Sequence, residues 1–223
     1  MSSLYVVATP IGNLEDISLR ALRILKEVDF VLCEDTRVSK KILDYYDIKN
    51  NLISFHHHSG DKKYEKILGI LKKGQSIALV SDAGTPNISD PGGQLVELVR
   101  ERLPDVNIEP IPGPSALTSA LSVSGIKADK FFFLGFLPHK KGRISAIKEM
   151  LDLKYPVVLY ESKYRISKLL QELLNLNFSK KIMIFREISK KHHSFYSDSV
   201  EELYKKFEQD KNNLKGEFTV IIY

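Results

Sequence analysis

Two adjacent carboxylates and an arginine lie close together near the start of the chain. They belong to the run Glu34-Asp35-Thr36-Arg37, which directly follows a short apolar segment. A partly buried carboxylate can orient a hydroxyl group of a substrate or accept its proton. The same side chains can also pair with one another as a local ion pair. The residue types therefore indicate acid–base chemistry and leave the structural alternative open.

Three loops rich in glycine and proline have the composition of ligand-binding segments. They cover residues 9–13, 81–93 and 111–116, and each follows an apolar run. Glycine lets the backbone approach a ligand, and proline fixes a loop before binding. Any one of them alone is better explained as a plain strand-to-helix turn. A loop of 13 residues is uncommon unless it binds something, so the three together predict a ligand site.

Standard nucleotide and metal motifs do not occur in the sequence. No G-x-G-x-x-G follows the first apolar run, and no G-x-x-x-x-G-K-[ST] occurs, which disfavours a dinucleotide dehydrogenase and a P-loop hydrolase. In a strand, His56 and His58 of the run His56-His57-His58 would face one side, as two metal ligands do. No cysteine pair, H-E-x-x-H motif or matching carboxylate accompanies them, so we expect no metal site.

The loops require a framework of alternating strands and helices. Strand candidates are the apolar runs 4–8, 30–33, 52–55, 76–80 and 106–109. Helices are predicted after Ser18 and over 39–46, 64–73, 94–102 and 115–123. Apolar strands separated by helices predict a mainly parallel sheet covered on both faces. Ligands bind at the carboxyl edge of such sheets, where the three loops and the acidic run follow strands.

The second half of the chain has a different pattern and a different charge. Strands are predicted at 157–160, 181–185 and 218–223, with helices at 164–174 and 200–207. We expect two domains, residues 1–115 and 116–223. The first carries 14 Lys and Arg against 16 Asp and Glu, and the second carries 19 against 12. This asymmetry indicates that the second half meets a polyanion, with a merely solubilising surface as the alternative.

Compact basic clusters account for part of that excess. Lys140, Lys141 and Arg143 form one cluster, and Lys190 and Lys191 form another. If these clusters are solvated turns, they need no further explanation. If they contact phosphates, they explain why the positive excess lies in the second half.

The overall composition is that of a soluble protein with a sizeable core. Apolar residues make up 43% of the chain, and no apolar run approaches the roughly 20 residues that span a bilayer. The N-terminal residues have no basic flank and are expected to form a strand, not a signal peptide. Cys33 is the only cysteine, so no disulfide forms within the chain and a cytoplasmic location is expected.

Nine motifs in order give the chain a family resemblance. They are Thr-Pro-Ile-Gly-Asn at 9–13, Glu-Asp-Thr-Arg at 34–37, Ser-Asp-Ala-Gly-Thr-Pro at 81–86, Asp-Pro-Gly at 90–92, Pro-Gly-Pro-Ser-Ala at 112–116, Gly-Phe-Leu-Pro at 135–138, Tyr-Glu-Ser at 160–162, Arg-Glu at 186–187 and Lys-Gly-Glu at 215–217. Together they resemble the small-subunit ribosomal RNA methyltransferase I family of the tetrapyrrole methylases. The resemblance extends from Leu4 to Tyr223. The chain departs from the family's usual residues at Ser59, Tyr164 and His193.

The resemblance implies a two-domain α/β fold with a mainly parallel N-terminal sheet and a mixed C-terminal sheet. It also implies a homodimer and S-adenosylmethionine as cofactor, bound in a cleft between the domains. The cofactor ligands that it implies are Pro10, Ile11, Gly12, Asp82, Ala83, Gly84, Thr85, Pro86, Ser115, Ala116, Tyr160 and Glu161. The substrate that it implies is the ribose 2′-hydroxyl of a decoding-centre cytidine in 16S ribosomal RNA of the small subunit.

A ribose hydroxyl is a poor nucleophile, so a nearby base must help to remove its proton. Asp35 and Glu34 are the first candidates for this catalytic role, and Glu161 is the next. Arg37, Arg165 and Arg186 would hold phosphates or orient carboxylates. Two alternatives remain open at this stage: a tetrapyrrole methyltransferase of the same fold, and a non-catalytic assembly factor that binds ribosomal RNA.

Overall fold

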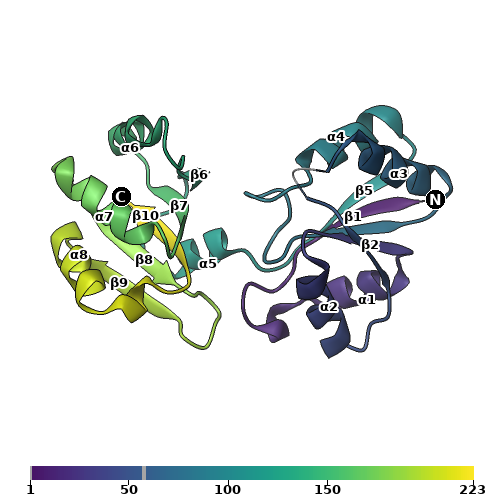
Figure 1. The fold of residues 1–223 in the computed structure, drawn as a ribbon, viewed down its shortest axis with the longest axis horizontal. Helices are drawn as coiled ribbons and strands as arrows, with labels where there is room; N and C mark the ends of the chain where they lie inside the picture. The colour runs from purple at the N-terminus through teal and green to yellow at the C-terminus, as the bar shows by residue number, and fades with distance from the viewer. Residues whose placement is uncertain (1, 57–58) are drawn as a thin grey trace. The chain divides into compact units, whose positions relative to one another are not determined.

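The structure, a computed structural model, describes residues 2–56 and 59–223 and divides the chain into two units (Figure 1). The first unit comprises residues 1–115 and the second comprises residues 116–223. Among the described helices, none is both long and apolar enough to cross a membrane.

Short apolar runs form a five-stranded sheet in the first unit. The strands are β1 (Ser3–Val7), β2 (Phe30–Cys33), β3 (Asn51–Ser54), β4 (Ile77–Val80) and β5 (Asn107–Ile111). Their order is β3-β2-β4-β1-β5, and every neighbouring pair is parallel. The mainly parallel sheet predicted for this part of the chain is confirmed.

Helices cover both faces of this sheet (Figure 1). They are α1 (Leu19–Glu27), α2 (Thr36–Tyr45), α3 (Asp61–Lys72) and α4 (Gly93–Arg102), and a short 3-10 helix, η1 (Leu14–Asp16), precedes α1. Apolar residues of α1 and α2 form one buried cluster with β1, β2 and β4. Those of α3 and α4 form a second cluster against the opposite face. Because the central strands β2 and β4 are covered on both sides, they are apolar without alternation, whereas the edge strands β3 and β5 contain polar and exposed residues.

The first two helices begin at polar caps. The Ser18 hydroxyl accepts a hydrogen bond from the Ala21 amide, as the sequence predicts for the start of α1. Asp35 caps α2 by accepting from the Arg37 amide. The prediction began that helix at residue 39, and it begins three residues earlier because the Asp35 carboxylate satisfies an amide of its first turn.

The second unit contains a mixed sheet. Its strands are β6 (Phe132–Phe136), β7 (Val157–Ser162), β8 (Ile182–Arg186), β9 (Ser194–Asp198) and β10 (Glu217–Ile222), in the order β6-β7-β10-β8-β9. Only the β6–β7 pair is parallel among these described strands. The mixed sheet that the family resemblance implies is therefore present.

Helices again lie on both faces of the second sheet. They are α5 (Ala116–Val123), α6 (Arg143–Asp152), α7 (Ile166–Asn175) and α8 (Val200–Gln209), and η2 (Lys211–Leu214) follows α8. Residues of α6, α7 and α8 pack into the main cluster with one face of the sheet. Residues of α5 pack against the other face through Val158, Phe185 and Ile221. The sequence analysis did not identify β6, α6 or β9.

Candidate active site

The three strands that precede the predicted loops end level with one another. Val7 of β1 lies opposite Val80 of β4 and Ile111 of β5. Because these strands are parallel, the loops that follow them leave the sheet side by side at its carboxyl edge. This edge of the first unit is the candidate active site.

An isolated β-bridge joins the first two loops. The Thr9 amide donates to the Gly84 carbonyl at 2.9 Å, and the Gly84 amide donates back to the Thr9 carbonyl at 3.0 Å. The Thr9 hydroxyl, which is buried, donates to the Ser81 carbonyl at 3.0 Å. These bonds fix the backbone of both loops before any ligand arrives, so less ordering entropy is lost on binding.

The second loop also contacts the third. The Thr85 hydroxyl donates to the Pro114 carbonyl at 3.2 Å. Gly84 has a φ of +83°, which favours glycine, and a β-carbon there would lie 3.4 Å from Ile11 Cγ2. The structure therefore brings together the three glycine–proline loops that the sequence singled out.

The predicted cofactor residues are divided between the two units. In the first unit, Pro10, Ile11, Gly84 and Pro86 are buried, Asp82, Thr85 and Ser115 are partly exposed, and Gly12 and Ala83 are exposed. Ala116, Tyr160 and Glu161 belong to the second unit. The buried residues shape the loops, whereas the exposed backbone at positions 12 and 83 is what a ligand at this edge would meet.

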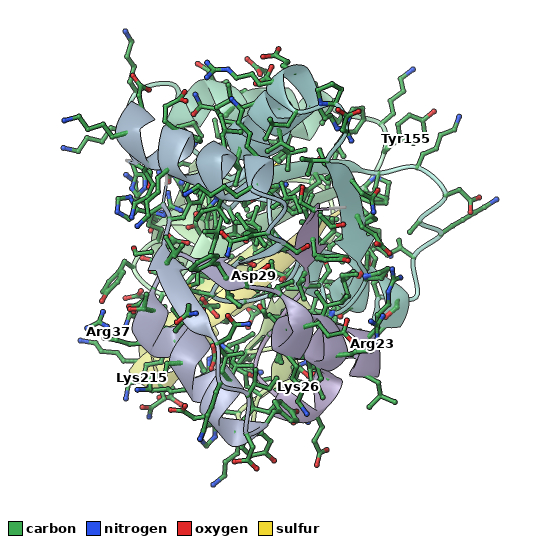
Figure 2. All side chains as sticks on the ribbon, turned by 90° about the vertical axis from the view of Figure 1, so that its right-hand side faces the viewer. Arg23, Lys26, Asp29, Arg37, Tyr155 and Lys215 are labelled. Atoms are coloured by element: carbon green, nitrogen blue, oxygen red, sulfur yellow. The ribbon has the colours of Figure 1, made fainter. Side chains whose placement is uncertain are left out.

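Asp35 forms a local ion pair with Arg37. The Arg37 Nη2 donates to Asp35 Oδ2 at 2.6 Å, and the Arg37 amide donates to Asp35 Oδ1 at 2.8 Å. These bonds hold the pKa of Asp35 at about 2. Such a carboxylate is a weak base, so the geometry favours the ion-pair interpretation over a catalytic one. The Arg37 side chain is 86% exposed and reaches the surface of its unit (Figure 2).

Asp82 lies beside Asp35 in a different environment. Its Oδ1 accepts a hydrogen bond from the Asp35 amide at 3.1 Å. Burial raises the pKa of Asp82, and the negative charge of Asp35 raises it further. Glu34, the second predicted base, is half-buried, and its carbonyl accepts from the Ser54 hydroxyl at 3.4 Å. Sequence reasoning assigned Asp82 to the cofactor alone, because only the fold shows that it lies next to the acidic run.

Tyr160 of β7 ties its strand to the start of α5. Its hydroxyl accepts a hydrogen bond from the Leu117 amide at 3.2 Å. Its ring packs against Phe133 and Phe136 of β6, with ring centroids 5.0 and 5.7 Å apart. Tyr160 is therefore held in place on a half-buried aromatic surface of the second unit.

Glu161 lies inside a buried ion-pair cluster. Arg143 Nη2 lies 3.2 Å from Glu161 Oε2, and Arg165 Nε lies 2.8 Å from Glu161 Oε1. Arg143 also donates to Glu172 of α7 at 2.7 Å. The Glu161 side chain has no exposed surface and pairs with two arginines, so its surroundings argue against its predicted role as a base. Its side chain is for the same reason not placed to bind a cofactor directly.

The residues predicted to bind RNA fall into two groups. Lys140, Lys141 and Lys191 are exposed. Five others bond within their own unit: Arg37 to Asp35, Arg143 and Arg165 to Glu161, Arg186 to the carbonyls of Lys215 and His192, and Lys190 to Glu187 and Glu217. Arg143 is 2% exposed and its guanidinium is paired with two glutamates, so its burial argues against the predicted contact with RNA.

No metal centre is assembled within the parts of the chain that the structure describes. There, no three His, Cys, Asp or Glu side chains gather as a metal ion needs. His57 and His58 lie outside the described residues. The His56 amide donates to the Ser59 hydroxyl at 3.0 Å.

Sequence comparisons connect the chain with one family. The Tetrapyrrole (Corrin/Porphyrin) Methylases match residues 3–204. A Thermotoga maritima protein named ribosomal RNA small subunit methyltransferase I is 44% identical over 222 residues, which cover 100% of this chain and 98% of that protein. A protein of the same name from Escherichia coli O157:H7 is 41% identical, over 98% of this chain and 77% of its own length.

Solved structures share the fold at low sequence identity. Cobalt precorrin-4 methyltransferase is similar with a TM-score of 0.69 and 16% identity, over 99% of this chain and 94% of that one. A uroporphyrin-III C-methyl transferase from Thermus thermophilus, complexed with S-adenyl homocysteine, is similar with the same TM-score and identity, over 99% and 97% of the two chains.

Proposed function

This chain belongs to the ribosomal RNA small subunit methyltransferase I family of the tetrapyrrole methylases, and from that premise we propose its reaction. It transfers a methyl group from S-adenosylmethionine to the ribose 2′-hydroxyl of a decoding-centre cytidine in 16S ribosomal RNA. The main observation behind the proposal is that hydrogen bonds link three glycine–proline loops at one edge of the sheet. The partly buried carboxylate of Asp82 lies beside them.

The sheet edge fits a cofactor of this kind. The bridge between Thr9 and Gly84 and the bond from Thr85 to Pro114 fix three loops, and Gly12 and Ala83 expose backbone there. Residues 10–12 and 82–86 would hold S-adenosylmethionine, and Ser115, Ala116 and Tyr160 would complete the set. The cofactor supplies a methyl group that its sulfonium charge already activates. The similar uroporphyrin-III C-methyl transferase that was solved with S-adenyl homocysteine supports this choice of cofactor.

The chain's own residues must orient the ribose and remove its proton. Asp82 is our candidate for the proton acceptor, because its raised pKa makes it a stronger base than Asp35. The Asp35 amide holds one oxygen of the Asp82 carboxylate and so fixes its direction. Glu34 remains the second candidate. Alignment of the hydroxyl with the methyl group contributes the rest of the rate enhancement.

A transfer assay with tritiated S-adenosylmethionine tests the reaction. Small ribosomal subunits that lack the modification, naked 16S ribosomal RNA and a tetrapyrrole are offered separately as acceptors. We expect label on ribosomal RNA, and mapping should place it on a ribose 2′-oxygen. Label on the tetrapyrrole alone would indicate a tetrapyrrole methyltransferase. S-adenosylmethionine binding without transfer to any acceptor would indicate the non-catalytic alternative.

We propose further that the enzyme acts as a cytoplasmic homodimer, as its family resemblance implies. Light scattering should give about twice the chain mass of 25.4 kDa. A monomer mass at the concentration used in the transfer assay would contradict the dimer without bearing on the reaction.

A further inference from the structure

Two exposed aromatic rings lie at the carboxyl ends of the parallel strands β6 and β7. Phe136, the last residue of β6, is 50% exposed, and Tyr164, in the turn after β7, is 82% exposed. Each has a cation over its ring. Lys163 Nζ lies 4.9 Å from the Tyr164 centroid, and the Arg165 guanidinium lies 5.7 Å from that of Phe136. We call Phe136 and Tyr164 the aromatic platform.

The turn that carries Tyr164 is firmly anchored. The Arg165 amide donates to the Ser162 carbonyl at 2.9 Å and closes the turn. The Arg165 side chain reaches the buried Glu161 and donates through Nη1 to the Leu137 carbonyl at 2.9 Å. A single exposed tyrosine needs no explanation, but one on an anchored turn is already ordered for contact.

The hydrogen bond from Arg165 to the Leu137 carbonyl also connects the aromatic platform to a basic loop. Leu137, whose carbonyl accepts from Arg165, lies two residues before the exposed run His139, Lys140 and Lys141. The acidic side chains of this region, Glu161 and Glu172, are turned inward and paired. The exposed surface therefore combines aromatic faces with positive charge and is complementary to a polyanion that carries flat rings.

We propose that the aromatic platform stacks unpaired bases of the RNA substrate, while Lys140 and Lys141 contact the adjoining phosphates. Single-stranded nucleic acid is held in this way by a cationic surface with exposed aromatic rings, because every base has a face that stacks. The inference rests on the proposed function, since it assigns the surface on which that substrate is held. A protein partner would gain little from the cationic rim, so unpaired RNA fits the surface better.

The test is a binding measurement that needs no methyl transfer. The probe is a single-stranded RNA oligonucleotide of the decoding-region sequence that carries one 2-aminopurine, whose fluorescence is quenched on stacking. We expect the protein to quench it, Tyr164→Ala to weaken the affinity about tenfold, and Tyr164→Phe to restore it. Circular dichroism and S-adenosylmethionine calorimetry should show both variants folded and equal in cofactor affinity, because Tyr164 is a surface residue.

Tyr155 provides a matched control. Its side chain lies at the surface (Figure 2). It is 43% exposed and has Lys130 Nζ 5.6 Å from its ring centroid. Tyr155 precedes β7, whereas Tyr164 follows that strand. Tyr155→Ala should bind the oligonucleotide like the unaltered protein. Equal affinity for Tyr164→Ala and the unaltered protein would overturn the inference, and so would an equal loss in both alanine variants. Failure of the proposed function would appear separately, as absence of methyl transfer by the unaltered enzyme.

Discussion

Asp35 and Asp82 lie at the same sheet edge, yet their pKa values shift in opposite directions. Arg37 and the start of α2 stabilise the charged form of Asp35, which lowers its pKa to about 2. Asp82 has lost part of its hydration and faces the charge of Asp35, so its pKa is raised. Environment rather than residue type gives these two carboxylates different pKa values, as in enzymes that separate an acid from a base.

Replacement of Asp82 should therefore slow the chemical step. Asp82→Asn keeps an oxygen that can accept from the Asp35 amide but cannot take a proton. We expect kcat for methyl transfer to fall about 100-fold or more. With the unaltered enzyme, kcat should rise with pH through the pKa of Asp82, because only the deprotonated form is a base, and this dependence should vanish in the variant.

The matched control for this prediction is Asp35→Asn. Its pKa of about 2 leaves Asp35 charged throughout the assay range, so Asp35 itself adds no pH dependence to kcat there. Asp35→Asn should keep the rise of kcat with pH and shift it to lower pH, because the charge of Asp35 raises the pKa of Asp82. Loss of the pH dependence in Asp35→Asn and its retention in Asp82→Asn would reverse the assignment.

At the scale of elements, the Asp35 cap makes the stability of α2 depend on pH. The pKa of Asp35 is about 2 in the folded protein against an ordinary value of 3.8. Because the folded state binds the proton less tightly, the stabilisation is complete above the ordinary value and is lost as pH falls towards 2. Asn also caps helices, so Asp35→Asn removes the charge and retains the cap.

Thermal unfolding of both proteins from pH 6 down to pH 2 checks this dependence. Asp35→Asn should have the lower Tm at pH 6, and the difference should shrink as the pH approaches 2. A difference in Tm that stays constant over this range would show that the ion pair with Arg37 contributes nothing to stability.

The buried cluster around Glu161 connects three elements of the second unit. Arg143 at the start of α6 bonds to Glu161 of β7 and Glu172 of α7. Breaking a buried ion pair by removing one partner costs about 3–5 kcal/mol, because a charge is left unpaired. Arg143→Met should lower the free energy of unfolding by about that amount in urea titrations.

Lys141→Met is the control for the same loop, because Lys141 is exposed. It should change the free energy of unfolding by less than about 0.5 kcal/mol. If the two variants were equally stable, Arg143 would not carry the structural role that its burial indicates.

Most of the framework could be predicted because apolar runs and helical spacing are local signals. Phe30–Cys33 has the predicted bounds, and Ser18 begins its helix as expected. Strand β9, Ser-Phe-Tyr-Ser-Asp, is an edge strand with mostly exposed residues, so it lacks the apolar run on which the prediction relied. Helix α6 begins at Arg143 behind a basic loop, and that basic run was interpreted as surface.

The loops of the site could be predicted from glycine and proline, but the pairing of side chains could not. Arg143 and Glu161 are 18 residues apart, and their contact depends on how α6 packs against β7. Asp82 and Asp35 are 47 residues apart and meet because β2 and β4 are neighbours in the sheet. Sequence spacing contains no sign of either contact, so the ion pair of Glu161 with Arg143 could not be predicted.

At the scale of the whole molecule, the two units differ in charge. Residues 116–223 carry the positive excess, whereas residues 1–115 are slightly acidic. Part of that excess is internal, since Arg143, Arg165 and Lys190 bond to glutamates of their own unit. The charge available to a polyanion is therefore concentrated in exposed lysines, among them Lys140 and Lys141.

The last prediction follows from this distribution of charge. If Lys140 and Lys141 each contact a phosphate, replacing both with alanine should weaken RNA binding and reduce the slope of log affinity against log salt by about 1.5, since each contact releases a counterion. Tyr164→Ala should weaken binding without changing that slope, because stacking is not ionic. Lys62 and Lys66 of α3 provide a matched control as exposed lysines of the acidic unit, and their replacement should change neither quantity. An unaltered slope in the Lys140/Lys141 double variant would show that the basic loop does not contact RNA phosphates, whether or not the aromatic platform stacks bases.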